Sequence, residues 1–175
     1  IAADMIEHLL DRAWSKPVAS KPAPHALPWK PVDEGCYQRG HFLLPAASAN
    51  EAWTWHEPDW KQIPGGFRSD PFAGKKLLTA SLAGQEATVH FKGRALGAYV
   101  LAGPDAGVLE VSIDGGKWQR VDLYHRHSRG LHYPRTVMFA TDLKTGAHTA
   151  KIRLSNKSNP LSKGAAARVL QFVVN

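Results

Sequence analysis

The chain has 175 residues, a formal net charge of +7 and a single cysteine, Cys36. Its length fits one domain, or one domain with a tail, and one cysteine excludes an intrachain disulfide. No apolar run reaches the about 18 residues of a membrane-spanning helix, so a membrane is not an expected partner. The first residues, Ile1 to Asp4, show neither the basic nor the apolar region of a signal peptide.

The positive charge is concentrated in one part of the sequence. The segment from Gly115 to Lys157 has nine basic and only two acidic residues, whereas the rest of the chain is neutral. Most such charges are solvated on strand faces, but a basic segment can also attract an anionic polysaccharide. No nucleic-acid-binding motif accompanies it, so nucleic acid is not an expected partner.

Residues 1–14 are predicted to form a terminal helix. Apolar residues recur there at helical spacing, with charged residues on the opposite face. They are Ile1, Met5, Ile6, Leu9, Leu10 and Ala13. An apolar stripe of this kind is expected to cover a neighbouring domain.

Residues 15–35 are predicted to form a linker. They include five prolines, which favour an extended chain over a helix: Pro17, Pro22, Pro24, Pro28 and Pro31. The composition differs from both flanks, so we expect a domain boundary here.

Residues 36–175 are predicted to form an all-β domain, an antiparallel, jelly-roll-like β-sandwich. Apolar and polar residues alternate in 87–92, 109–113 and 150–154, as in strands with one buried face. The Asp114-Gly115-Gly116-Lys117 segment predicts a hairpin turn, and Trp118 beyond it is either at a bulge or a surface aromatic. Eight or nine short strands at this spacing are typical of a sandwich.

Three tryptophans close together form the first candidate ligand-binding group. Trp53, Trp55 and Trp60 lie near Glu57 and Asp59. Indole faces stack on sugar rings, and carboxylates accept hydrogen bonds from sugar hydroxyls. The alternative is that these side chains close one end of the core.

The second candidate group lies in the polar segment Tyr124–Pro134. It contains His125, Arg126, His127, Arg129, His132 and Tyr133. Loops rich in such residues on a rigid scaffold often bind partners or polar ligands. Two or three histidines without a fixed carboxylate or thiolate make a weak zinc signal, so no metal or cofactor is expected. Ser128 lacks the context of a hydrolase nucleophile, so no catalytic residue is predicted.

Two segments carry a resemblance to a known family. IAADMIEHLLDRAW (residues 1–14) resembles the last helix of SGNH/GDSL hydrolases. FKGRALGAYVLAGPDAGVLEVSIDGGKWQRVDLY (91–124), LHYPRTV (131–137) and RVLQFVVN (168–175) resemble the carbohydrate-binding-like β-sandwich attached C-terminally to some bacterial SGNH/GDSL esterases. The order helix, linker, sandwich agrees with this resemblance.

The resemblance implies a non-catalytic accessory module, because the family's nucleophile, oxyanion-hole residues and Asp-x-x-His block would all precede Ile1. It also implies an N-terminal SGNH hydrolase domain as partner, a saccharide ester as substrate of the parent protein, and a secreted or periplasmic location. Two alternatives remain: a purely structural domain that braces the hydrolase, or a Tyr124–Pro134 loop that completes the esterase pocket.

Overall fold

The computed structural model describes residues 2–17, 21, 24, 26, 29–30, 33, 35–65, 72 and 74–175. Its contacts divide the chain into two compact units, Ile1–Glu34 and Gly35–Asn175. Ile1 and the linker prolines Pro22, Pro28 and Pro31 lie outside the described residues.

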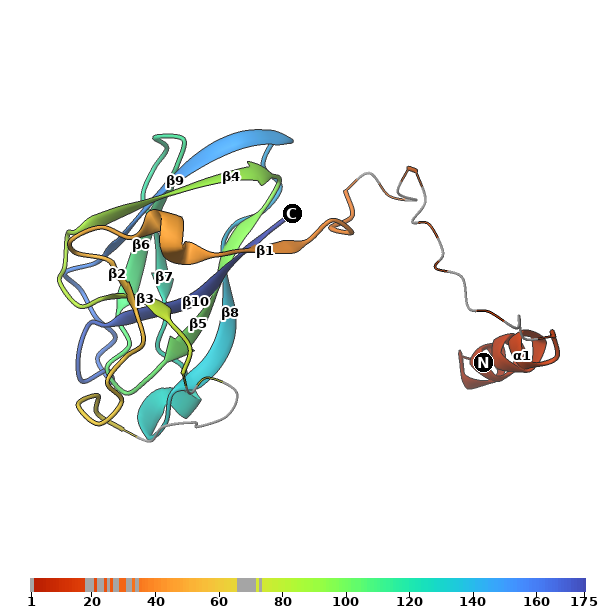
Figure 1. Ribbon diagram of the computed structural model, residues 1–175, viewed down its shortest axis with the longest axis horizontal. Helices are drawn as coiled ribbons and strands as arrows, with labels where there is room; N and C mark the ends of the chain where they lie inside the picture. The colour runs from red at the N-terminus through yellow and green to blue at the C-terminus, as the bar shows by residue number, and fades with distance from the viewer. Residues whose placement is uncertain are drawn as a thin grey trace. The chain divides into compact units, whose positions relative to one another are not determined.

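The first unit contains the predicted helix, α1, which spans Ala2–Trp14 (Figure 1). Its apolar stripe is open to solvent, with Met5 63% and Leu9 66% exposed. At its end, Ser15 donates from its backbone N–H to the carbonyl of Asp11. Neither this nor any other described helix is long and apolar enough to cross a membrane.

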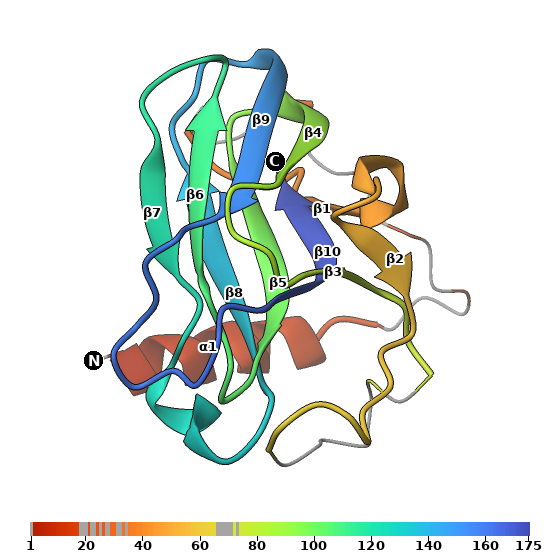
Figure 2. The same cartoon turned by 90° about the vertical axis from the view of Figure 1, so that its left-hand side faces the viewer.

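The second unit is an antiparallel β-sandwich, as the sequence predicts (Figure 2). One six-stranded sheet has the order β2-β3-β10-β5-β8, with β1 also paired to β10, and a four-stranded sheet has the order β4-β9-β6-β7. The strands of the first sheet are β1 (His41–Leu43), β2 (Thr54–His56), β3 (Leu77–Ala80), β5 (Leu96–Ala102), β8 (Tyr133–Ala140) and β10 (Ala167–Val174). Those of the second are β4 (Glu86–Gly93), β6 (Val108–Ile113), β7 (Gln119–Asp122) and β9 (Gly146–Leu154), and two short 3₁₀ helices, η1 (Pro45–Ser48) and η2 (Arg126–Arg129), lie in the connections.

The core lies between the two sheets and follows from the period-two pattern. In β4, Val89 and Phe91 point inward and are 2% and 5% exposed, while His90 between them faces solvent. β5 lies inside its sheet, between β10 and β8, and is buried along almost its whole length. Residues 95–101 are apolar at both parities, the pattern of a strand that is covered on both faces.

The hairpin between β6 and β7 has the predicted turn. Asp114 and Gly115 have φ values of 50° and 75°, the left-handed conformation that a type I′ turn needs. Trp118, just after the turn, is a surface aromatic that remains 36% exposed. Of the two interpretations offered for Trp118, a bulge or a surface aromatic, the structure therefore shows the surface aromatic.

Candidate functional site

The η2 segment forms an ordered end to the sandwich. His125 caps the 3₁₀ helix, and its Nδ1 accepts a hydrogen bond from the backbone N–H of His127 at 3.3 Å. Ser128 returns the contact, because its Oγ accepts from the backbone N–H of His125 at 3.2 Å. The Ser128 side chain is fully buried. It therefore stabilises the turn and is not presented to solvent as a nucleophile would be.

Three aromatic rings meet on this segment, and we call His125, His127 and Tyr133 the η2 aromatic cluster. The rings of His125 and Tyr133 stack almost in parallel, 4.8 Å apart with an angle of 11°. His127 tilts against both, with 5.1 Å between ring centroids in each pair. His125 and Tyr133 are half-buried and His127 is exposed. The cluster thus holds its rings rigidly while part of it stays open to a ligand.

Two arginines, Arg126 and Arg135, lie beside the η2 aromatic cluster. Arg126 donates from Nε to Nε2 of His127 at 3.3 Å, and Arg135 donates to the backbone carbonyls of Leu123 and Tyr124. Burial, followed by the charges of Arg135, His127 and Arg126, lowers the pKa of His125. His125 is therefore neutral near pH 7, so its Nδ1 remains an acceptor for the cap.

Two other residues of the predicted group take different positions. Arg129 ends the η2 helix and is exposed. His132 is 1% exposed and makes an edge-on ring contact with Trp60, with centroids 5.1 Å apart. A Cβ on Gly103 would overlap the His132 imidazole, so glycine is needed there for close packing. His132 thus supports the end of the sandwich from inside and does not face a ligand.

The three predicted tryptophans do not form one platform. Trp53 is fully buried in the main core, where its Nε1 donates to the carbonyl of Gln85 at 2.9 Å. Trp60 is half-buried against a small second core formed by Phe72, Leu77 and Leu101. Trp53 therefore has no exposed face on which a sugar could stack, and Trp60 has little.

Trp55 lies in β2 and lines a hollow of about 390 Å³. Tyr99 and Gln171 form part of the same wall, and Lys75 and Lys76 lie beside it. The sequence did not single out these four residues, although Tyr99 is the one residue with a hydroxyl in the apolar run of β5. The hollow therefore combines three aromatic rings, those of Trp55, Phe72 and Tyr99, with an amide and two ammonium groups.

The described residues offer no group of three or more His, Cys, Asp or Glu side chains placed to hold a metal ion. The side chains of the η2 aromatic cluster and of the Trp55 hollow can stack on a ligand and form hydrogen bonds with it.

Comparison with known proteins identifies the fold. No family model matches the sequence, and no curated protein matches it. Two crystal structures of a two-domain esterase active on acetylated mannans match with TM-scores of 0.56, at 16% and 17% identity, over 98% of this chain. A family two carbohydrate esterase from Cellvibrio japonicus matches with a TM-score of 0.49, at 14% identity, over 77% of this chain and 33% of its own.

This chain spans only 44% and 45% of the two-domain esterase in those two structures. At such identities the likeness establishes a shared fold. The resemblance to the β-sandwich of an esterase that the sequence suggested is thus confirmed at the level of the fold.

Proposed function

We propose that residues 36–175 are a non-catalytic, carbohydrate-binding-like accessory module of an SGNH/GDSL-type esterase that acts on saccharide esters. The observation that carries the proposal is the η2 aromatic cluster, which gathers His125, His127 and Tyr133 at one end of a rigid sandwich. Arg126 lies beside it as a hydrogen-bond donor.

The chemistry of the cluster suits a sugar. An aromatic ring face offers a sugar dispersion contact with its C–H groups, while a neutral imidazole and a guanidinium hydrogen-bond to hydroxyls. The lowered pKa keeps His125 neutral, so a sugar meets no buried charge there. The rings are already ordered before binding, which lowers the entropy cost of complex formation. Trp55 and Tyr99, in the hollow on β2 and β5, provide a second pair of rings for a longer glycan.

The partner in this proposal is an SGNH hydrolase domain preceding the sandwich, and the parent protein is secreted or periplasmic, as the sequence resemblance implies. The sandwich then holds a glycan close to a catalytic domain that supplies the nucleophile. A two-domain esterase of similar fold acts on acetylated mannans and was crystallised with mannopentaose. We therefore take mannopentaose and acetylated mannan as the first ligands to test.

The test is calorimetric titration of the 175-residue chain with mannopentaose and with soluble acetylated mannan. Tyr133→Ala and His127→Ala should each weaken binding about 2- to 10-fold, the range for loss of one aromatic contact. His8→Ala, an exposed histidine of α1, is the matched control and should leave the affinity unchanged.

Absence of any saccharide binding by the wild-type chain would overturn the proposal. A sandwich that raises the melting temperature of an attached hydrolase domain without binding sugar would instead be a structural brace. If His127→Ala in the parent esterase lowers the turnover of the ester but leaves glycan affinity intact, the result would favour a loop that completes the esterase pocket.

A further inference from the structure

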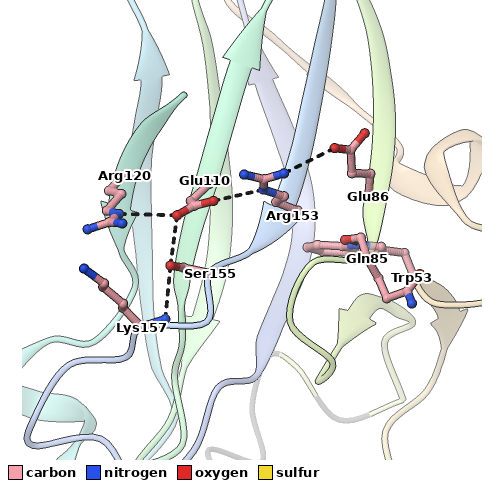
Figure 3. Close-up of polar contacts among 8 residues, drawn as sticks. All are labelled: Trp53, Gln85, Glu86, Glu110, Arg120, Arg153, Ser155 and Lys157. Carbon is pink, nitrogen blue, oxygen red and sulfur yellow. Dashed lines mark hydrogen bonds and ion pairs between the residues drawn. The ribbon is translucent and has the colours of Figure 1, made fainter. Parts of the chain in front are cut away.

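A row of alternating charges crosses the outer face of the four-stranded sheet (Figure 3). We call Glu86, Arg153, Glu110 and Arg120 the charge ladder, because they are neighbours in register on β4, β9, β6 and β7. Arg153 Nε lies 2.9 Å from Glu110 Oε2, and its Nη1 lies 3.6 Å from Glu86 Oε1. Arg120 Nε completes the row at 3.3 Å from Glu110 Oε1.

Glu110 fixes the centre of this ladder. Its carboxylate also accepts a hydrogen bond from Ser155 Oγ at 3.0 Å, and its side chain is only 13% exposed. Hydrogen bonding from Arg153 is the largest influence on the pKa of Glu110 and lowers it, although burial acts in the opposite direction. Glu110 is therefore ionised near neutral pH, and the Arg153 side chain is held in one position.

Arg153 in turn positions the indole of Trp118. Its guanidinium carbon lies 4.0 Å from the centre of the Trp118 ring, a cation–π contact. The guanidinium lies over one face of the ring, and the residue as a whole is 36% exposed. An exposed indole is thus fixed in place on a strand face that is otherwise polar.

A hollow of about 420 Å³ adjoins this indole. Ser112, Thr149 and Lys151 supply hydroxyl and ammonium groups to its lining. Its acidic residues, Glu86 and Asp114, are balanced by Lys151 and Arg153. Its size is within the range of small-molecule sites, and its lining has both donors and acceptors but no net charge.

We propose that this face binds a neutral polysaccharide chain, with Trp118 as the stacking platform and Lys151 and Thr149 as hydrogen-bonding groups. A sugar hydroxyl both donates and accepts, so it matches a lining of mixed donors and acceptors. A polyanion would find no net positive charge in this lining. The site lies on a sheet face, away from the η2 aromatic cluster at the end of the sandwich. This inference rests on the proposed function only in taking carbohydrate as the class of ligand.

The experiment is an NMR titration of the 175-residue chain that follows the indole N–H signals, with soluble glucomannan as the probe. Trp118→Phe assigns the Trp118 signal, and polygalacturonate serves as the acidic comparison. We expect the Trp118 signal to shift with glucomannan and not with polygalacturonate. Trp118→Ala should weaken glucomannan binding about 2- to 10-fold, whereas Trp29→Ala, which removes an indole that is 88% exposed in the other unit, should not.

Lys151→Ala tests the same hollow independently, since Lys151 is an exposed strand residue whose loss leaves the core untouched. It should also weaken glucomannan binding. Binding that depends on Tyr133 while the Trp118 signal stays still would overturn this inference and leave the proposed function intact. A Trp118 signal that shifts with polygalacturonate alone would overturn the neutral ligand, and no binding of any saccharide would overturn both proposals.

Discussion

Asp105 and Arg168 form a nearly buried ion pair that fastens the β5–β6 turn to β10. Arg168 donates from Nη1 to Oδ1 at 2.8 Å and from Nη2 to Oδ2 at 2.6 Å. The two side chains are only 13% and 7% exposed. Burial alone would raise the pKa of Asp105, but the hydrogen bonds and the charge of Arg168 outweigh it and lower the pKa below 3.8. Asp105 is therefore ionised at neutral pH and fully paired.

Asp105→Asn keeps the shape of the side chain and removes its charge. The Arg168 guanidinium then stays buried without its counter-ion, which costs about 3–5 kcal/mol in comparable pairs. A domain of this size loses about 2–4 °C of melting temperature per kcal/mol, so we expect a fall of roughly 6–20 °C. The cost should shrink as the pH falls. A carboxylate whose pKa is lowered by folding stabilises the fold at pH values above its pKa in the unfolded chain, and this contribution is lost when the carboxylate is protonated.

The assay is unfolding of the 175-residue chain by heat and by urea, at pH 7 and at lower pH values, followed by circular dichroism. Lys151→Gln is the matched control, since its ion pair with Glu86 at 3.2 Å is exposed to solvent and should contribute no more than about 1 kcal/mol. Combining Asp105→Asn with Arg168→Met should cost less than the sum of the two single changes. A loss in Asp105→Asn no greater than in the control would refute the structural role given to this pair.

Three further outcomes follow from the packing. Trp53→Ala should lower the free energy of unfolding by about 3–5 kcal/mol in the same urea assay, because it empties a fully buried core position; a loss below about 1 kcal/mol would contradict that position. Gly103→Ala should cost about 1–3 kcal/mol, because the new methyl group overlaps a buried imidazole, and unchanged melting would show that the end of the sandwich is looser than the structure indicates. His148→Gln should destabilise the fold more at pH 5.5 than at pH 8.5. Hydrogen bonding between the two side chains raises the pKa of His148 above 6.5 and lowers the pKa of Asp114 below 3.8. Both groups are therefore charged at pH 5.5, and the contribution of the charged histidine is lost as the pH rises through its pKa in the folded state. Equal losses at both pH values would contradict this pairing.

The strands could be predicted where the alternation is long and local. Val89 and Phe91 mark the buried face of β4 because the pattern repeats over the whole strand. β2, at Thr54–His56, was missed: it has three residues, and its pairing with β3 involves a partner more than 20 positions away. The proline and glycine neighbours of Asp105 indicate a turn, but its carboxylate bonds to Arg168, a partner 63 positions away that no local pattern indicates.

The candidate site, like the strands, could be predicted from the sequence only where its contacts are local. The η2 aromatic cluster could be proposed from the sequence because its members are near neighbours along the chain. Trp53 and Trp55 have the same parity, yet one is in the core and the other lines a surface hollow. The alternation rule does not apply to this pair because β2 begins only at Thr54, after Trp53. The burial of His132 likewise depends on Gly103, a residue of another connection.

Formal charges counted along the sequence do not show where the net charge lies on the folded surface. The segment from Gly115 to Lys157 carries the whole formal excess of positive charge, but the acids of the charge ladder come from outside that segment. Within the ladder each arginine lies beside a carboxylate, and Lys151 pairs with Glu86. The sheet face is therefore close to neutral, while Arg126 and Arg129 are exposed at the η2 end. Since salt screens exposed charges most strongly, a salt-dependent attraction of anions would belong to the η2 end, and binding on the sheet face would depend on stacking and hydrogen bonds instead.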